Sequence, residues 1–533
     1  MTTADALIAA LRAHGVELMF GYPGHHTLPI YEALRTQPVG QELASCPRKV
    51  RHVLVRHEQA AGFAADGVAR SSGRVGVFVT TAGPGATNTL TAVATAYSDC
   101  VPLLCLTAQV RTDRHLKHAG AYHDLDLLAA FAPAVKWNAA PERPEDVPAL
   151  VAEALRIAQT PPPGPVHLDL PEDILAAETD ALLVAPLEVP RPAPRAHQLA
   201  AAAGLLLSGQ RPLLLAGGGV VSAEACGELV GLAEALGAPV ATTCMGKGAI
   251  PASHPLSIGV TQSGRCVPAF EQADLLLAVG CRFGEVSTRG WSLPIPAKLI
   301  HVDADPRVIG ATFKPTLGLV ADAKLVLTEL LREVRRARLK SSPWFTPPAA
   351  PAQRPEGAEA AYQAINDCLR EALDPTAIVC LDVCMPAYRM VSRFDVEQPR
   401  SLLYPASYIA MGYGLPAAIG AKLAHPDRQV AVVCGDGGFL MTAQELATAV
   451  REKLPLPIVL YNDECLTSVA GSHRRRYDGH TFGTDLTNPD FVALAQAFGA
   501  DGERLEDVAD VPSALQRALA SAVPYLVEFR QPR

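Results

Sequence analysis

The sequence predicts an α/β protein with three domains, each built around a parallel β-sheet. Strand-length apolar runs alternate with helix-length segments along most of the 533 residues, which is the pattern of parallel sheets whose strands are joined by helices. Two proline-rich stretches interrupt this alternation. The chain is also too long for one hydrophobic core, because single domains usually hold about 100–200 residues.

The first domain is expected at residues 1–178. A helical pattern opens it near residues 3–14, and a proline-rich turn precedes its last expected strand. The strands are expected at residues 18–21, 53–56, 76–80 and 166–170. Residues 186–194 then contain four prolines, which predict a semi-rigid, extended linker.

The second domain is expected at residues 190–340 and the third at residues 356–533. Strands of the second domain are expected at residues 212–216, 275–279 and 299–302. Three consecutive glycines, Gly217 to Gly219, follow the first of these strands. Residues 341–355 contain five prolines and no periodic apolar pattern, which predicts a second linker.

Composition excludes several classes of partner. The formal net charge is −8 and the twelve cysteines are scattered, so neither a basic surface for nucleic acid nor a zinc site is expected. No uncharged apolar stretch reaches the ~20 residues of a membrane span. The first five residues lack the basic and apolar regions of a secretory signal. We therefore expect a cytoplasmic protein with reduced cysteines and with no nucleic-acid or membrane partner.

The third domain carries the pattern of a metal site at the edge of a sheet. One apolar run, residues 430–434, ends before Asp436, and a second, residues 456–461, ends before Asp463. Neighbouring parallel strands lie about 4.8 Å apart, so both carboxylates can reach one cation. Mg²⁺ suits this arrangement, because it combines a few carboxylates with phosphate oxygens.

The residues around Asp436 predict that the anion is a diphosphate. Gly435, Gly437 and Gly438 allow backbone N–H groups to approach phosphate oxygens. A helix expected at about residues 442–453 would point its positive N-terminus at the same anion. The alternative is an ordinary tight turn with two solvated acids.

A second candidate site lies in the first domain at Glu58. This acid stands where an apolar strand passes into a helix of small residues, 60–70. A carboxyl group at the end of a strand, among alanine and glycine, could share a proton with a bound base. The alternative is a glutamate that merely favours the positive end of the helix dipole.

Several longer motifs connect the two candidate sites. They are Gly21-Tyr22-Pro23-Gly24, Arg56-His57-Glu58-Gln59, Thr81-Ala82-Gly83-Pro84-Gly85-Ala86-Thr87-Asn88, Met411-Gly412-Tyr413-Gly414-Leu415-Pro416, Gln444-Glu445-Leu446 and Asn462-Asp463. In order and spacing the chain resembles the thiamine diphosphate enzymes of the acetolactate synthase type along nearly its whole length. The resemblance implies a pyrimidine-binding first domain, a central domain and a diphosphate-binding last domain. It also implies a homodimer or homotetramer in which two subunits share each active site.

The resemblance implies roles for individual residues on the pyrimidine side of the cofactor. Glu58 is expected to bond the pyrimidine N1′, so that the cofactor can deprotonate its own thiazolium ring. Pro23 and the loop Gly83-Pro84-Gly85 are expected to line the pyrimidine. The carbonyl of Ile409 is expected to accept a hydrogen bond from the 4′-amino group. Met411 would hold the two rings in a bent conformation, although a methionine there could also simply fill the core.

On the diphosphate side, the resemblance implies that Asp436 and Asp463 are the magnesium ligands from side chains and that Cys465 supplies a backbone carbonyl. Position 463 is commonly asparagine in the family, so the aspartate should strengthen the dependence on Mg²⁺. Other departures surround the substrate: residues 382–386, residues 122–124 and Ser472 differ from the usual acetolactate synthase pattern. They weaken the acetolactate assignment and leave the cofactor assignment unchanged.

Other features are similar to the 2-oxo acid decarboxylases of arginine catabolism, which act on 5-guanidino-2-oxopentanoate. They include Gly24-His25-His26-Thr27-Leu28 and Asn488-Pro489-Asp490-Phe491. His25, His26 and His123 are candidates for proton relay, because imidazole donates and accepts protons near neutral pH. Loop histidines could also merely satisfy backbone groups. A basic cluster, Arg474 to Arg476, could meet a substrate carboxylate, but solvent exposure is the stronger expectation.

The leading hypothesis is decarboxylation of a 2-oxo acid that depends on thiamine diphosphate and Mg²⁺, followed by carboligation as in acetolactate synthase. The alternatives are a decarboxylase that forms an aldehyde and a catalytically silent paralogue that binds the cofactor. Relatives carry FAD in the central domain. Gly217 to Gly219 and Arg282-Phe283 allow FAD there without requiring it.

Overall fold

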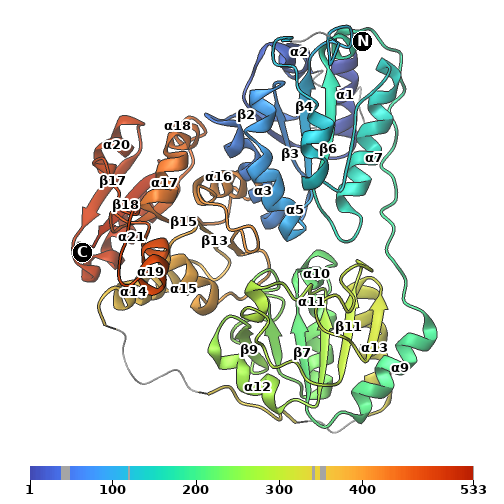
Figure 1. Cartoon of the computed structure of the whole chain (residues 1–533), viewed down its shortest axis with the longest axis vertical. Coiled ribbons are helices and arrows are strands. Elements are labelled where there is room, and N and C mark those ends of the chain that lie inside the picture. The colour runs from blue at the N-terminus through green and yellow to red at the C-terminus, as the bar shows by residue number, and fades with distance from the viewer. Residues whose placement is uncertain (38–48, 118–119, 339–341, 349–355, 532–533) are drawn as a thin grey trace.

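The structure, a computed structural model, describes residues 1–37, 49–117, 120–338, 342–348 and 356–531. It consists of three lobes, each built around a six-stranded sheet in which every paired strand is parallel (Figure 1). The predicted fold class, three parallel-sheet α/β domains, is therefore confirmed. Most of the sequence that had been expected to form the second linker lies outside the described residues.

The first sheet has the strand order β2-β1-β3-β4-β6-β5. Its strands are β1 (Leu18–Gly21), β2 (Arg51–Leu54), β3 (Gly76–Thr80), β4 (Leu103–Gln109), β5 (Trp137–Ala139) and β6 (Val166–Pro171). The helices around it are α1 (Thr3–Ala13), α2 (Leu28–Thr36), α3 (Glu58–Ser72), α4 (Pro84–Thr87), α5 (Leu90–Asp99), α6 (Leu127–Phe131), α7 (Val147–Gln159) and α8 (Glu172–Ala176), with the 3₁₀ turns η1 (His25–Thr27), η3 (Ala132–Ala134) and η4 (Pro144–Asp146). Strand β3 is buried along its whole length, as expected for a strand covered on both faces.

The central sheet has the order β12-β11-β10-β7-β8-β9. Its strands are β7 (Pro212–Ala216), β8 (Val240–Thr242), β9 (Ser257–Val260), β10 (Leu275–Val279), β11 (Leu299–Asp303) and β12 (Leu317–Val320). Its helices are α9 (Ala196–Ser208), α10 (Gly218–Ser222), α11 (Cys226–Leu236), α12 (Val267–Gln272) and α13 (Ala323–Arg336), with η5 (Gly264–Cys266) and η6 (Val286–Thr288). This order is that of the dinucleotide-binding α/β fold, in which the order reverses between the first and fourth strands.

The last sheet has the order β14-β13-β15-β16-β18-β17. Its strands are β13 (Ile378–Leu381), β14 (Leu402–Leu403), β15 (Val430–Gly435), β16 (Pro457–Asn462), β17 (Asp501–Leu505) and β18 (Tyr525–Arg530). Its helices are α14 (Ala358–Ala372), α15 (Met385–Arg393), α16 (Gly414–Ala424), α17 (Asp436–Thr442), α18 (Leu446–Arg451), α19 (Thr467–Arg476), α20 (Phe491–Ala497) and α21 (Val511–Ala520), with η7 (Ala443–Glu445) and η8 (Val508–Asp510). Counted within each domain, the strand order equals that of the first sheet.

One expected element of the last domain is wrong. The sequence predicted a single helix over residues 442–453, but helix α17 begins at Asp436 and is followed by η7 and α18. The glycines after β15 belong to the helix and not to a loop. The helix breaks at η7 because Glu445 turns inward and accepts hydrogen bonds from the N–H of Arg56 at 2.9 and 3.2 Å.

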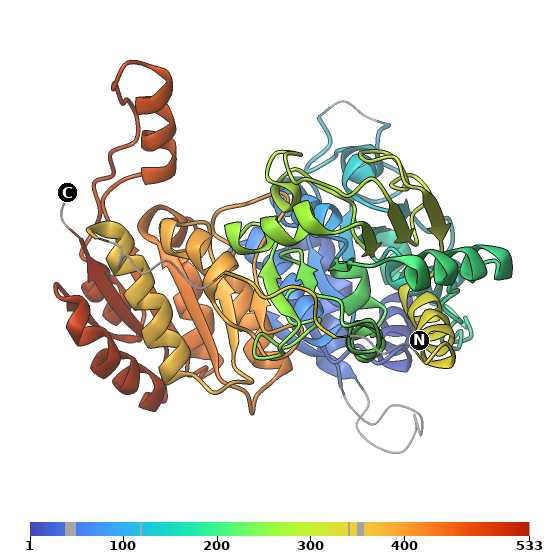
Figure 2. The same cartoon turned by 90° about the horizontal axis from the view of Figure 1, so that it is seen from below.

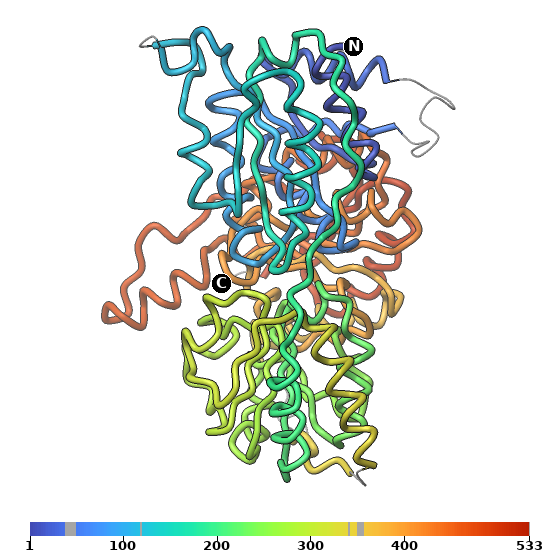
Figure 3. Tube along the Cα trace, turned by 90° about the vertical axis from the view of Figure 1, so that its right-hand side faces the viewer, coloured from blue at the N-terminus to red at the C-terminus, as the bar shows by residue number. Residues whose placement is uncertain are grey.

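An extended segment connects the first and central domains. Residues 179–195 contain no helix or strand, and Figure 3 shows them running along the outside of the molecule from one domain to the other. Pro190, Pro192 and Pro194 lie in this segment. Within the described residues, no helix has both the length and the apolar character needed to cross a membrane.

The first and last domains share one hydrophobic core. Helices α3 and α16 lie side by side between the two sheets (Figure 1), and one cluster of buried apolar residues continues from Phe63 to Tyr413. The two backbones approach so closely that a Cβ atom on Gly67 would lie 2.1 Å from the carbonyl oxygen of Ala417. Only glycine fits at this contact.

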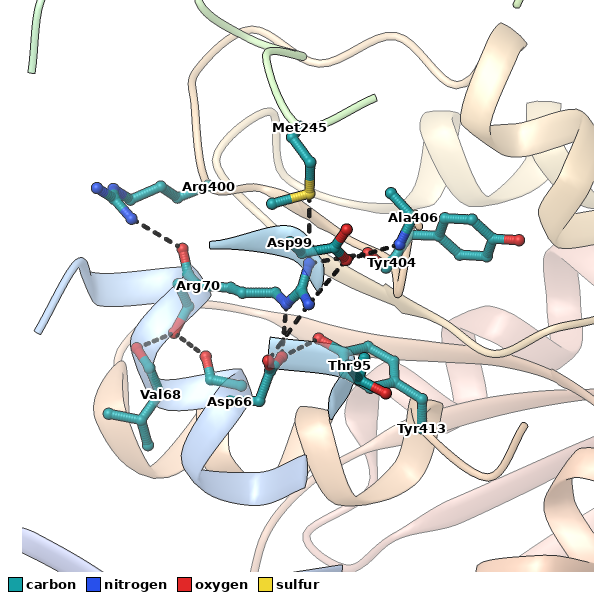
Figure 4. A network of polar contacts seen from close by, with 12 residues as sticks. Asp66, Val68, Arg70, Thr95, Asp99, Met245, Arg400, Tyr404, Ala406 and Tyr413 are labelled. Carbon is teal, nitrogen blue, oxygen red and sulfur yellow. Dashed lines mark hydrogen bonds and ion pairs between the residues drawn. The ribbon is translucent and has the colours of Figure 1, made fainter. Parts of the chain in front are cut away.

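A buried ion cluster around Arg70 joins this interface to the central domain (Figure 4). The guanidinium group bonds Asp66 at 2.5 Å and Asp99 at 3.0 Å, and both carboxylate side chains are fully buried. It also donates to the carbonyl of Tyr404 at 3.0 Å and to the sulfur of Met245 at 3.3 Å. Arg70 therefore contacts all three domains at once.

We expect Arg70→Met to lower the free energy of unfolding by about 3–5 kcal/mol, because two carboxylates would remain buried without their cation. Denaturant titration of the purified protein would measure this loss. Arg74→Met is the control: Arg74 bonds Glu17 at 2.7 Å with 44% of its side chain exposed, and such surface pairs contribute about 1 kcal/mol at most. Equal effects of the two substitutions would contradict the role of the cluster.

Candidate active site

The acidic residues of the last domain meet at the carboxyl ends of two neighbouring strands. Strands β15 and β16 pair with Gly435 opposite Tyr461, so Asp436 and Asp463 follow adjacent strand ends. Asp436 is 3% exposed, and its Oδ1 accepts a hydrogen bond from the N–H of Gly437 at 2.8 Å. Asp463 accepts from the N–H of Cys465 at 3.2 Å and from the hydroxyl of Thr467.

The donors around Asp436 fit a hard divalent cation. Burial raises the pKa of Asp436, and the charge of Asp463 raises it further, so a cation would relieve the cost of placing both charges here. The amide of Asn488 donates to Asp436 at 2.8 Å and to Asn462 at 2.9 Å. Its Oδ1 is buried and has no hydrogen-bond partner among the described residues. Oxygen ligands of this kind are typical of Mg²⁺ sites.

The glycines beside Asp436 lie close to other groups of the site. A Cβ atom on Gly437 would lie 3.0 Å from Leu466 and 3.3 Å from the methyl group of Met411. On Gly435 it would lie 2.9 Å from Cys384. Larger side chains would therefore fill the space around the Gly435-Asp436-Gly437 turn. The structure places the methyl group of Met411 beside this turn.

Asp382 holds the segment that carries Met411, and the sequence analysis missed this role. Its buried carboxylate accepts hydrogen bonds from the N–H groups of Val383 at 2.6 Å, Gly412 at 3.1 Å and Gly414 at 2.9 Å. Burial raises the pKa of Asp382. An acid directly after strand β13 was the available signal, because strand order in this sheet reverses between β13 and β15 and ligands bind at such switch points.

Ile409, two residues before Met411, has an unusual backbone conformation. Its φ angle is +53°, in the left-handed region that branched side chains rarely adopt. Its N–H donates to the carbonyl of Pro405 at 3.0 Å. Strained residues of this kind cost about 1–3 kcal/mol and gather at functional sites, where the surrounding structure holds them.

Glu58 begins helix α3 at the corresponding edge of the first sheet, where strand order reverses between β1 and β3. Its Oε2 accepts a hydrogen bond from the amide of Asn88 at 3.0 Å. A Cβ atom on Gly85 would lie 3.4 Å from its Oε1. The turn Gly83-Pro84-Gly85 therefore borders the carboxylate.

The histidines gather beside the same turn. Pro23 is exposed and His26 is 7% exposed, whereas His25 faces solvent. The rings of His26 and His123 have centroids 5.8 Å apart, and Tyr122 stacks on His123 at 3.8 Å. Burial lowers the pKa of His123, and the nearby His26 and His25 lower it further.

The carbonyl of His123 also lies against the Gly83 turn. A Cβ atom on Gly83 would meet that oxygen at 2.7 Å, so the predicted residues of the first domain form one group. The hydrogen bonds of Glu58 and of Asp436 stay inside their own domains. Among the described residues, the hydrogen-bond partners of Glu58 and of Asp436 thus define two half-sites, one in each domain.

A third feature is a cavity of about 640 Å³ between the domains. It lies where strand order reverses between β7 and β10, and Gly218, Gly219 and Arg282 line it. Phe283, by contrast, is packed in the core of the central domain. These residues are recognisable in the sequence as positions that allow FAD, but the sequence does not predict the cavity.

Two cations in the cavity wall donate hydrogen bonds to backbone carbonyl oxygens of described residues. Lys247 donates to the carbonyl of Val391 at 2.8 Å, and burial lowers its pKa to about 8. Arg400 donates to the carbonyls of Arg70 and Val221, both at 3.3 Å. The lining also contains the acidic residues Asp99, Glu224, Asp303 and Asp322, so the cavity wall carries charges of both signs.

Helix α19 extends away from the body of the molecule (Figure 2). Arg474, Arg475 and Arg476 lie on it and are exposed, which agrees with the solvent exposure expected from sequence. Tyr477 and Phe482 follow the helix with 59% and 89% of their surface exposed. No residue of this arm lines the cavity of about 640 Å³.

Three family models match the chain in order. They are the N-terminal TPP binding domain of thiamine pyrophosphate enzymes at residues 1–130, the central domain at residues 199–330 and the C-terminal TPP binding domain at residues 384–529. The matches to the first and last domains contain Glu58 and Asp436, respectively.

Curated relatives match almost the full chain. A probable acetolactate synthase large subunit of Methanocaldococcus jannaschii is 37% identical over 99% of this chain and 92% of its own length. A probable 2-ketoarginine decarboxylase of Pseudomonas aeruginosa is also 37% identical, over 99% of this chain and 94% of its own length. The acetolactate synthase large subunit of Corynebacterium glutamicum is 37% identical over 97% of this chain and 84% of its own length. The chain therefore belongs to the thiamine pyrophosphate enzyme family, in the group of the acetolactate synthases and 2-oxo acid decarboxylases.

Proposed function

We propose that this protein decarboxylates a 2-oxo acid with thiamine diphosphate and Mg²⁺. The observation that carries the proposal is the pair of half-sites at equivalent switch points of two sheets with the same strand order. One half holds Glu58 and the other holds Asp436 and Asp463. Thiamine diphosphate, when bound, would supply the carbanion and the electron sink that decarboxylation of a 2-oxo acid requires.

The side chains of the last domain would hold the charged end of the cofactor. Asp436 and Asp463 would bind Mg²⁺ together with the backbone carbonyl of Cys465. The N–H groups of Gly437 and Gly438 would face the diphosphate, although that of Gly437 donates to Asp436 in this structure. Met411 would support the bent cofactor, and the carbonyl of Ile409 would accept a hydrogen bond from its amino group.

The first domain would hold the pyrimidine ring. Glu58 would share a proton with the ring nitrogen, while Asn88 keeps the carboxylate in place. Pro23 and the turn Gly83-Pro84-Gly85 would line the ring. A dry pocket would favour this proton transfer, because hydrogen bonds and charges act more strongly away from water.

We infer that two copies of the chain form each complete site, as a homodimer or a homotetramer. The separation of Glu58 from Asp436 within one chain supports this assembly. Large apolar side chains are also exposed beside both half-sites: Leu28 and Tyr122 at 57% and 63% in the first domain, and Tyr408 and Met441 at 53% and 54% in the last. Exposed apolar patches of this kind favour burial against a partner.

Two outcomes can follow the loss of CO₂. Ligation to a second carbonyl compound, as the names of the acetolactate synthase relatives suggest, is the first candidate. Protonation to an aldehyde is the second, and the buried His26 beside the Glu58 half-site favours it, as does the name of the 2-ketoarginine decarboxylase relative. The three domains proposed for this chemistry are residues 1–178, 190–340 and 356–533.

Product analysis tests the proposal. The purified protein, supplied with thiamine diphosphate and Mg²⁺, is given pyruvate, 2-oxobutyrate and 5-guanidino-2-oxopentanoate in turn. Release of CO₂ is expected with at least one of them, and it should stop when a chelator removes Mg²⁺. An aldehyde without acetolactate from pyruvate would overturn ligation. Cofactor binding without CO₂ from any 2-oxo acid would overturn the proposed function.

Glu58→Gln should reduce CO₂ release by at least about 100-fold, because the amide cannot share a proton with the pyrimidine nitrogen. Mg²⁺ binding should change little, since the expected ligands lie in the other domain. A CO₂ assay and equilibrium dialysis against Mg²⁺ would measure the two effects. Turnover close to that of the unmodified protein would refute the role of Glu58.

Asp463→Asn should weaken Mg²⁺ affinity by about tenfold, because the charge of the ligands sets the affinity for a hard cation. Dialysis with increasing Mg²⁺ would show the shift directly. The matched control is Asp501→Asn on strand β17, an exposed aspartate away from both half-sites. An unchanged Mg²⁺ affinity in the Asp463 variant would argue against its role as a ligand.

The cavity between the domains is proposed to bind FAD. Its volume of about 640 Å³ suits a large cofactor, and its place at a switch point of the central sheet is where dinucleotides bind. We expect the purified protein to be yellow and to release a flavin on denaturation. Lys247→Met should lower the flavin content, because the cation facing the anionic ligand is lost. A colourless protein that does not take up added FAD would contradict this proposal.

A further inference from the structure

His26 occupies a position that its neighbours define closely. It lies in η1 directly after Gly24, and a Cβ atom on Gly24 would be 2.5 Å from Thr81. Thr81 in turn lies beside Gly85, which borders Glu58. The turn that carries His26 therefore adjoins the Glu58 half-site, although it follows a different strand.

The carboxylate of Glu172 fixes the orientation of this imidazole. Its Oε2 lies 2.9 Å from Nδ1 of His26. Glu172 is the first residue of helix α8, directly after the buried strand β6. A carboxylate only accepts hydrogen bonds, so Nδ1 carries the proton and donates it. The opposite nitrogen, Nε2, is left for other chemistry.

The paired Nδ1 leaves the other ring nitrogen of His26, Nε2, to be considered. It is buried and has no hydrogen-bond partner among the residues that the structure describes. Buried polar atoms are nearly always paired, and exceptions need an explanation such as a bound ligand or a catalytic role. The titratable groups placed around the ring are Glu172 on α8, Tyr122 and His123 after β4, and His25 on the same turn.

We propose that Glu172 is a positioning residue that holds His26 with its Nε2 toward the substrate, and that His26 is the acid that ends the reaction with an aldehyde. This inference rests on the proposed decarboxylation. In this step the N–H bond at Nε2 would break and a C–H bond would form at the former keto carbon. The aldehyde would then leave when the bond from this carbon to the cofactor breaks and the hydroxyl group on the carbon loses its proton to solvent. The electron pair left by CO₂ makes the new bond, and a proton from solvent restores the imidazolium. The step involves no oxidation or reduction.

The carboxylate of Glu172 holds the imidazole through its hydrogen bond with Nδ1 and so prevents the ring from turning. Neutral His26 after the transfer keeps its Nδ1–H bond to the carboxylate. The ring is therefore ready for reprotonation in the same orientation.

The test measures the ratio of aldehyde formed to CO₂ released in a single turnover, with the 2-oxo acid that the unmodified protein turns over best. In Glu172→Gln the ratio is expected to fall about tenfold, because general acid catalysis contributes at least that much. The KM for the 2-oxo acid should stay within about twofold of that of the unmodified protein, because Glu172 acts through His26 and not on the substrate. A purely structural role of Glu172 would leave the ratio of aldehyde to CO₂ unchanged.

Control variants separate this inference from folding defects. Glu145→Gln, at an exposed glutamate of η4 in the same domain, should leave the ratio unchanged. His26→Gln should lower the ratio of aldehyde to CO₂ as Glu172→Gln does. This variant can be measured instead if the Glu172 variant does not fold. The ratio of aldehyde to CO₂ in the double variant should be no lower than in His26→Gln alone, because both substitutions remove the function of the same acid, His26.

The outcomes distinguish this inference from the proposed function. If the unmodified protein releases no CO₂ from any 2-oxo acid, the proposed function fails and the inference fails with it. If CO₂ is released but the ratio of aldehyde to CO₂ in Glu172→Gln equals that of the unmodified protein, only the inference is overturned. The inference would also be overturned if the two substitutions lowered the ratio of aldehyde to CO₂ additively in the double variant. A protein that forms only ligation products would overturn it as well.

Discussion

The buried guanidinium group of Arg70 is the interaction on which the arrangement of the domains depends. A charge removed from water must be surrounded by partners in good geometry, and here those partners come from different parts of the chain. Asp66 lies one helical turn before Arg70 on α3, Asp99 ends α5, and the Tyr404 carbonyl belongs to the last domain. The need to satisfy one cation therefore fixes the first and last domains relative to each other.

The same cluster determines the position of the segment that carries the expected cofactor contacts. Asp99 accepts hydrogen bonds from the N–H groups of Ala406 at 2.8 Å and Ser407 at 3.0 Å. Asp66 accepts from the hydroxyl of Tyr413 at 2.9 Å. Both ends of the segment around Ile409 and Met411 are thus tied to buried carboxylates of the first domain. Such constraints can hold a residue such as Ile409 in a strained conformation.

Topology explains why the chemistry gathers where it does. In the first and last sheets the strand order reverses at the same place, and the loops on either side of a reversal diverge and leave a crevice. Glu58, His26 and the Gly83 turn surround one such crevice, whereas Asp436 and Asp382 surround the other. The central sheet has a different order, and its reversal opens onto the large cavity instead.

Local patterns in the sequence were sufficient to predict most of the strands and the acids at two strand ends. Apolar runs marked the strands, because parallel strands buried on both faces are almost wholly apolar. Acids at two strand ends marked the site around Asp436 and Asp463. The helix expected over residues 442–453 was wrong, because nothing local shows that Glu445 is drawn toward Arg56 across the domain interface.

Local sequence is therefore enough to predict the set of strands, the fold class and the residue types at the strand ends. These depend on neighbours within a few positions, where periodicity and turn chemistry act. Only the tertiary structure decided the partners: Asp382 with the Gly412 turn, Asn488 with Asp436, and Glu172 with His26. The last two residues are 146 positions apart. Their pairing results from the order of strands in the sheet, which local sequence does not encode.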